Sequence, residues 1–178
     1  MDAWNTLDRL MIISSDAHAG ALPEHYRSYL PSQWHDQFDE WLAQLTMHWF
    51  DITDDRNWDS PARMRALDDE GVTGEVIFPN TLPPFYDILA HLSGVPRDRA
   101  DFERRWAGLQ AHNRWLVDFC SDAPDRARGL IQLLPNDVEA AVDEMEWASS
   151  RSVFGNVTWR KLARLRPVAP WGAGRLRP

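Results

Sequence analysis

The sequence is short of several residue types and patterns, and each shortage removes a class of protein. The single cysteine, Cys120, excludes an internal disulfide framework and is typical of a reducing cytoplasm. No run of about 18 apolar residues occurs, so no membrane-spanning helix is expected. Residues 1–8 lack the basic and apolar regions of a signal peptide. We therefore expect a cytoplasmic protein without a membrane span.

Two glycine-rich phosphate-binding motifs are also absent. Neither G-x-G-x-x-G nor G-x-x-x-x-G-K-[ST] occurs in the sequence, so a nucleotide site has no support.

Lysine is nearly absent, and the basic side chains that do occur are unevenly distributed. Lys161 is the only lysine. Residues 151–178 hold seven basic side chains and no acidic one, whereas residues 1–150 hold twelve basic and 27 acidic side chains, a net charge of −15. This division predicts a folded acidic part over 1–150 and an atypical, Arg- and Pro-rich tail over 151–178. We interpret the tail as disordered or as the product of a shifted reading frame.

Apolar segments of strand length alternate with amphipathic segments of helix length across the acidic part. This order is typical of parallel βαβ units, in either an open doubly wound sheet or a closed barrel. Three strands are predicted at 10–15, 74–78 and 128–134, with a weak fourth within 152–159, and helices are predicted at 23–30, 32–44, 61–70, 101–122 and 138–148.

Three of these helices carry more detailed predictions. Ser32, Ser60 and Asp101 are expected to act as N-caps, because each stands just before a helical pattern. In the last helix, the helical spacing predicts a core-facing side, made of Val138, Ala141, Val142 and Met145.

Asp16 and His18 stand at the predicted carboxyl end of the first strand. Side chains two positions apart in a strand point the same way, so both are expected to face the mouth of a barrel or sheet. A carboxylate and an imidazole together suit Zn²⁺ or Mn²⁺, which accept mixed nitrogen and oxygen ligands. The alternative is that Asp16 only caps a turn.

Four segments, in order, resemble one protein family. Residues 12–20 (IISSDAHAG) are similar to the strand-1 motif of the amidohydrolase-related family (amidohydrolase family 2), in the branch of aminocarboxymuconate semialdehyde decarboxylase. Residues 63–79 (RMRALDDEGVTGEVIFP), 113–126 (NRWLVDFCSDAPDR) and 128–142 (RGLIQLLPNDVEAAV) resemble the following helices and strands of that branch. Together the segments span roughly residues 10–148.

The resemblance implies a fold and a chemistry. The fold is a (β/α)8 barrel, of which this sequence would supply three to four βα units as an N-terminal fragment. The chemistry is metal-dependent hydrolysis or decarboxylation of a small carboxylate-bearing organic substrate. The first two metal ligands of the family come from an H-x-H or acidic-x-H pair, which implies Asp16 and His18 here. The later ligands have no counterpart, so we expect this chain alone to be inactive, and self-association into a homo-oligomer is left open.

Other polar residues are weaker candidates. Asn80, after the second strand, and His48 and Arg56, in the insertion after the first, are predicted to contact substrate. Asn80 is better explained as a turn residue after Pro79. The other histidines, His25, His35, His91 and His112, are expected to be surface or partly buried residues.

Two further interpretations remain open. The basic tail, with Trp159 and Trp171, would make the chain a small acidic α/β domain with an anion- or nucleic-acid-binding arm, although no recognised binding motif accompanies it. The ten tryptophans either line a pocket or anchor loops and helices.

Overall fold

Four parallel strands form the centre of the structure, a computed structural model that describes residues 11–45, 53–151 and 153–156. The strands are β1 (Ile13–Ala19), β2 (Gly74–Pro79), β3 (Ala127–Gln132) and β4 (Val153–Asn156), and they pair in that order. The helices are η1 (Pro23–Tyr29), η2 (Ser32–Trp34), α1 (His35–Gln44), η3 (Asp55–Asn57), α2 (Ser60–Glu70), α3 (Arg99–Ser121) and α4 (Val138–Ser149).

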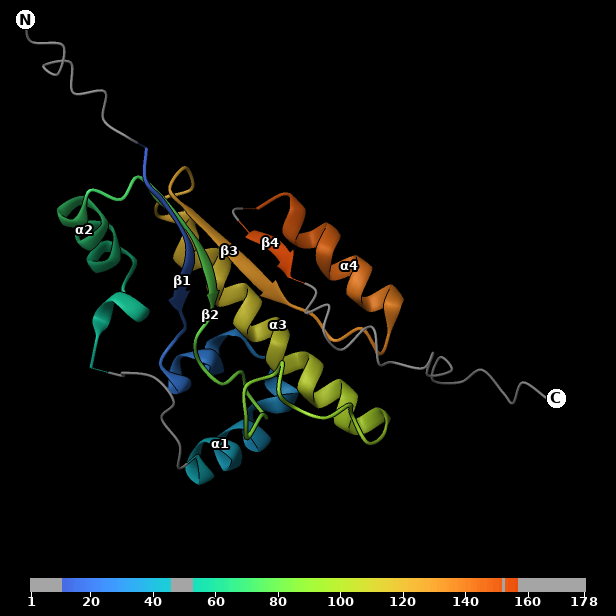
Figure 1. Ribbon diagram of the computed structural model, residues 1–178. Coiled ribbons are helices and arrows are strands. Elements are labelled where there is room, and N and C mark those ends of the chain that lie inside the picture. The colour runs from blue at the N-terminus through green and yellow to red at the C-terminus, as the bar shows by residue number, and fades with distance from the viewer. Residues whose placement is uncertain (1–10, 46–52, 152, 157–178) are drawn as a thin grey trace, which may run out of the picture.

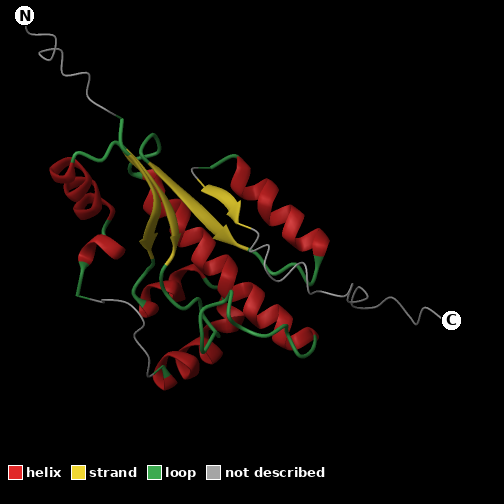
Figure 2. Cartoon of the chain, viewed as in Figure 1, coloured by secondary structure: helices red, strands yellow, loops and turns green. Residues whose placement is uncertain are grey.

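The sheet has one covered face. Figures 1 and 2 show α3 and α4 on the same side of the strands. In β3 the residues facing this helix layer, Ala127 and Ile131, are buried, whereas Arg128 and Leu130 on the opposite face are only half-buried. The core accordingly lies between the sheet and α3, where Ile77, Leu116 and Phe119 meet. The side chains of α3 thus pack against a sheet surface that includes small residues such as Ala127.

Strand order distinguishes between the two parallel architectures that the sequence allows. Each new strand is added next to the previous one, and the helices α3 and α4 that connect the strands stay on one face. A doubly wound sheet reverses its strand order and places helices on both faces, whereas a barrel does neither. The described residues therefore form a mixed α/β, singly wound parallel sheet of the kind found in part of a barrel.

Strand β1 extends further than its sequence predicts. It ends at Ala19, so Asp16 and His18 lie inside the strand and not after it. Its pairing with β2 slips between Ser14 and Ala17, where three steps along β1 match two along β2. Such a bulge changes the direction of the side chains beside it. Because residues 14–16 are polar, a search for apolar runs does not detect this part of the strand.

The three predicted N-caps were wrong. Ser32 opens the short helix η2 without a capping bond. Asp59 caps α2 by accepting a hydrogen bond from the amide of Ala62, and Ser60 is the first helical residue. Asp98 caps α3 in the same way through the amide of Asp101. At α2 and α3, the predicted cap and the observed cap are both of a type that caps helices and lie close together in sequence. Only the backbone angles show which of the two is the N-cap.

For α4 the predicted core-facing side was wrong at three of its four residues and right at Ala141. Val138, Val142 and Met145 are 62%, 45% and 41% exposed, whereas Ala141, Glu144 and Ala148 are buried. Helical periodicity identifies an apolar side but does not say which neighbour covers it. In the described residues this side of α4 has no covering element.

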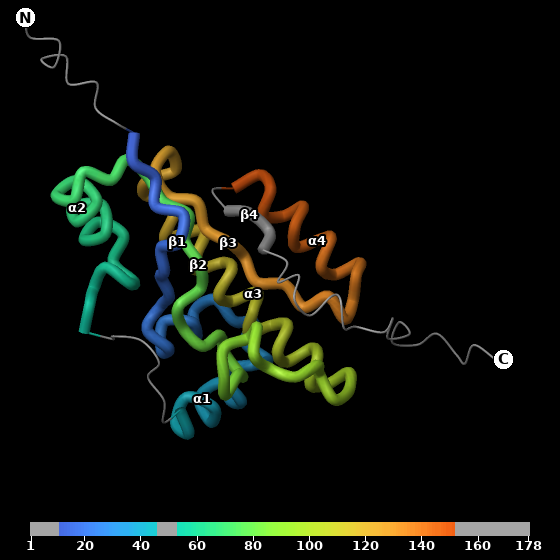
Figure 3. The backbone as a smooth tube through the Cα atoms, viewed as in Figure 1, coloured from blue at the N-terminus to red at the C-terminus, as the bar shows by residue number. Residues whose placement is uncertain are grey.

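A second layer lies beyond the carboxyl ends of the strands. Figure 3 shows α1 and the segment 80–98 together in this region. Trp41 of α1 donates a hydrogen bond to the carbonyl of Tyr86 at 3.0 Å, and the Phe38 and Phe85 rings pack edge to face. Aromatic residues therefore anchor the long connections, as one of the two interpretations of the tryptophan content predicts. Within the described ranges, none of the helices has the length and apolarity that crossing a bilayer requires.

Candidate metal centre

Asp16 and His18 project from the uncovered face of β1. Their side chains are 85% and 49% exposed, whereas the intervening Ala17 and the following Ala19 are buried against the helix layer. The alternation confirms that the two polar side chains share one face, as the period of a strand requires. Asp16 Oδ1 and His18 Nε2 lie 3.5 Å apart.

This spacing is compatible with a shared ion. Two ligands each about 2.1 Å from a tetrahedral ion lie about 3.4 Å apart. A carboxylate oxygen with an imidazole nitrogen is also a donor set that Zn²⁺ and Mn²⁺ accept. Among the residues that the structure describes, however, no group of three or more His, Cys, Asp or Glu side chains converges in this way. Asp16 and His18 therefore fit two positions of a coordination shell and leave the others unfilled.

The pair stands on a well-supported backbone. Arg63 of α2 donates through Nη1 to the carbonyl of His18 at 3.0 Å and to the carbonyl of Arg56 at 3.3 Å. The same guanidinium pairs with Glu75, whose side chain is only 1% exposed. On the other side, the His18 ring packs near Phe78, with ring centroids 5.7 Å apart. Contacts from α2 and β2 thus limit how far the end of β1 can move.

The predicted substrate residues have different placements. Asn80 follows β2 at the same edge: its amide donates to the carbonyl of Ala19, and its side chain donates to Asn57 Oδ1 at 3.2 Å. Arg56 is exposed in η3 and pairs with Asp54 at 2.7 Å and with Glu70 at 3.7 Å. His48 and the tail beyond Asn156 lie outside the described residues. The structure thus brings Asn80 to the edge where His18 lies, and keeps the Arg56 side chain occupied with acidic neighbours.

Sequence patterns missed a buried polar cluster behind this edge. The Tyr26 hydroxyl accepts a hydrogen bond from the amide of Ala21, and it is hydrogen-bonded with Thr81 Oγ1 at 2.5 Å and with His112 Nδ1 at 2.9 Å. His112 is fully buried, which corrects its prediction as a surface or partly buried residue. Burial lowers the pKa of its imidazole to about 3, so the ring is neutral near pH 7.

Cys120 takes no part in this chemistry. It is buried on α3, and burial raises the pKa of its thiol to about 12. A protonated, inaccessible thiol is a poor nucleophile and a poor ligand, which confirms its prediction as a structural residue.

Comparisons with known proteins give structural matches only. No family model matches the sequence, and no curated protein matches it. Among solved structures, a dihydroxybenzoic acid decarboxylase from a Polaromonas species, with bound manganese and 2-nitroresorcinol, matches with a TM-score of 0.41 and 20% identity. A 5-carboxyvanillate decarboxylase from Novosphingobium aromaticivorans, complexed with manganese and 4-hydroxy-3-methoxy-5-nitrobenzoic acid, matches with a TM-score of 0.47 and 18% identity.

These matches cover 79% and 80% of this chain but only 35% and 40% of the two decarboxylases. A 2,6-dihydroxybenzoate decarboxylase complexed with 2,6-dihydroxybenzoate matches to a similar extent, with 22% identity and a TM-score of 0.41. The three matched proteins are decarboxylases. At this level of similarity they do not by themselves assign an activity to this chain.

Proposed function

We propose that this chain supplies the first metal-binding strand of a divalent-metal-dependent enzyme. The enzyme would decarboxylate or hydrolyse a small carboxylate-bearing organic substrate. The observation that carries the proposal is the placement of Asp16 and His18 on one exposed face of β1, 3.5 Å apart. In such enzymes a bound divalent ion orients the substrate and stabilises developing negative charge.

The chain's own residues prepare the site. Arg63 and Glu75 fix the backbone at His18 from behind, so the imidazole is presented on a rigid strand and not on a loop. Asn80, at the neighbouring strand end, offers an amide for a substrate oxygen, and it would exchange its present bond to Asn57 for that contact.

The remaining ligands would come from outside the described residues. We propose that β1 to β4 with their helices form the first half of a (β/α)8 barrel. Two features support this arrangement: the singly wound strand order and the uncovered sheet face that carries Asp16 and His18. The exposed apolar side of α4 would then be the surface that the next helix covers.

Titration of the purified chain with Mn²⁺, followed by electron paramagnetic resonance of the free ion, tests the proposal. We expect one weak site, because two protein ligands are present. His18→Ala and Asp16→Asn should each weaken it by more than the roughly tenfold loss typical of an outer-shell residue. His25→Ala, which removes an exposed imidazole from η1, is the matched control and should leave binding unchanged.

Equal Mn²⁺ binding by the parent chain and His18→Ala would contradict the proposal. The matched solved structures are decarboxylases. Decarboxylation is therefore the first reaction to assay on any longer form of the protein that binds the ion.

A further inference from the structure

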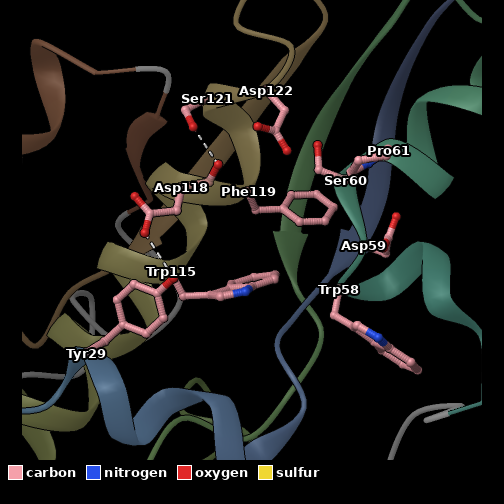
Figure 4. Close-up of a pocket in the computed structure, with 10 residues that line it drawn as sticks. All are labelled: Tyr29, Trp58, Asp59, Ser60, Pro61, Trp115, Asp118, Phe119, Ser121 and Asp122. Carbon is pink, nitrogen blue, oxygen red and sulfur yellow. Dashed lines mark hydrogen bonds between the residues drawn. The ribbon is translucent and has the colours of Figure 1, made fainter.

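A cleft lies between the start of α2 and the last turns of α3. Its volume is about 410 Å³, and it is formed by residues 58–61 on one side and by residues of 115–122 on the other, with Tyr29 of η1 at one end (Figure 4). Trp115 and Phe119 belong to the core between α3 and the sheet. The cleft is therefore on the helix side of the sheet, opposite the face that carries Asp16 and His18.

Aromatic rings make the walls of this cleft. Trp115 and Phe119 are 5% and 4% exposed, and their ring centroids lie 5.1 Å apart. Tyr29 and Trp58 are half-buried and complete the walls. The negative faces of such rings attract cations, tryptophan most strongly.

Three exposed carboxylates, of Asp59, Asp118 and Asp122, lie around the aromatic side chains, and none of the described residues that line the cleft is basic. Asp59 caps α2 and Asp118 accepts the Tyr29 hydroxyl at 2.9 Å, so each of these two carboxylates has oxygen left to accept another donor. Asp122 is the C-cap of α3, where its backbone amide donates to the carbonyl of Cys120, and its carboxylate has no hydrogen bond or ion pair with any other described residue. The cleft thus brings three carboxylates close to aromatic side chains.

Ser60 adds an independent observation. The residue is 4% exposed, and its Oγ has no hydrogen-bond partner among the described residues. Figure 4 shows this hydroxyl directed to the side of the cleft where Asp122 lies. A buried hydroxyl without a partner is costly, and a group supplied from the cleft would relieve that cost.

We propose that this cleft binds a small protonated amine with an aromatic or compact apolar body. The ammonium group would donate to Ser60 Oγ and to the Asp122 carboxylate, and the apolar body would pack against Trp115 and Phe119. A primary ammonium satisfies both acceptors, because it carries three donors and a positive charge. This site uses none of the residues of the proposed metal centre, so its test does not depend on metal binding.

Benzylammonium chloride is a suitable probe, and benzyl alcohol is its neutral comparator of nearly the same shape. Binding is measured by saturation-transfer NMR and by calorimetric titration of the whole chain at neutral pH. We expect benzylammonium to bind at least tenfold more tightly than benzyl alcohol and to weaken several-fold between 20 and 300 mM NaCl, as expected for an electrostatic contact.

Variants then locate the site. Asp122→Asn should weaken benzylammonium binding at least fivefold and Ser60→Ala about threefold, whereas binding of the alcohol should change little. Asp125→Asn removes an exposed carboxylate in the next turn, outside the cleft, and is the matched control. Unfolding curves of each variant establish that the fold is retained. Equal binding of amine and alcohol, or equal losses in Asp122→Asn and Asp125→Asn, would overturn the proposal.

Discussion

Arg63 and Glu75 form a two-bond ion pair beneath the end of β1. Arg63 Nε lies 3.0 Å from Glu75 Oε1 and Nη2 lies 2.8 Å from Oε2, and the two side chains are 14% and 1% exposed. The third nitrogen of the same guanidinium, Nη1, donates to the carbonyls of His18 and Arg56. One buried pair therefore connects α2, β2 and the strand that carries the proposed metal ligands.

Removing one partner of this pair should be costly. We expect Arg63→Ala to lower the free energy of unfolding by about 3–5 kcal/mol, because it leaves the Glu75 carboxylate buried and unpaired. Arg27→Ala breaks the exposed pair with Asp39, bonded at 2.8 Å, and should lower the free energy of unfolding far less. Urea unfolding followed by circular dichroism compares the two. Equal losses would mean that burial does not decide the strength of these pairs.

The close approach of α3 to the backbone of Pro84 leads to a second prediction. A Cβ atom added to Gly108 of α3 would lie 2.1 Å from the carbonyl oxygen of Pro84, and a backbone atom cannot rotate away. Gly108→Ala should therefore destabilise the chain by about 1–3 kcal/mol, although alanine favours a helix by about 1 kcal/mol. The measurement is the thermal unfolding midpoint.

Gly94→Ala is the control for this prediction. An added Cβ at Gly94 meets nothing within 4 Å, and its effect should stay within about 0.5 kcal/mol. A stabilised Gly108→Ala variant would show that helix propensity outweighs the contact with Pro84.

Sequence patterns predicted the alternation of strands and helices because short apolar runs, such as residues 76–78 in β2 and 129–131 in β3, stand between helical patterns. They misplaced the end of β1, because a strand that carries Asp16 and His18 on an exposed face has no such run. The side-by-side placement of these two residues followed from their spacing alone. The register slip beside them depends on pairing with β2, which no local pattern records.

Long-range contacts explain what the sequence did not predict. Glu144 lies on the buried side of α4 because Gln110, Asn113 and Arg114 of α3 all donate to its carboxylate. His112 is buried because Tyr26, 86 residues away in sequence, provides its hydrogen bond. A charged or polar residue inside a helix pattern is ordinarily assigned to the surface, and only its distant partners reverse that assignment.

The uncovered side of α4 gives a prediction about association. Val142 and Met145 are 45% and 41% exposed, beside Val138 at 62%. We expect the purified chain to self-associate through this side, and Val142→Lys with Met145→Lys should shift it toward the monomer in light scattering. Glu139→Gln with Glu146→Gln changes the net charge equally, at exposed positions of the same helix, and should leave association unchanged. A monomeric parent chain would contradict this expectation.

The buried imidazole of His112 should make stability depend on pH. Its pKa is about 3 in the folded chain and about 6.5 when exposed, so below pH 6.5 the unfolded chain takes up a proton that the folded chain does not. The stability that His112 contributes is therefore complete above pH 6.5 and is lost as the pH falls toward 3, with a slope of up to about 1.4 kcal/mol per pH unit.

The pH window separates this effect from that of the buried carboxylate Asp101. Its arginine neighbours and the Arg97 amide outweigh burial and lower the pKa of Asp101 to about 2 from 3.8, so its contribution is lost only below about pH 4. Urea unfolding between pH 4.5 and 6 should therefore give a steeper slope for the parent chain than for His112→Gln, whereas His25→Gln, which changes an exposed ring, should keep the parental slope. If His112→Gln and the parent lose stability in parallel across this window, the imidazole is protonated in the fold, and the hydrogen bond with Tyr26 must then be rearranged to accommodate a charge.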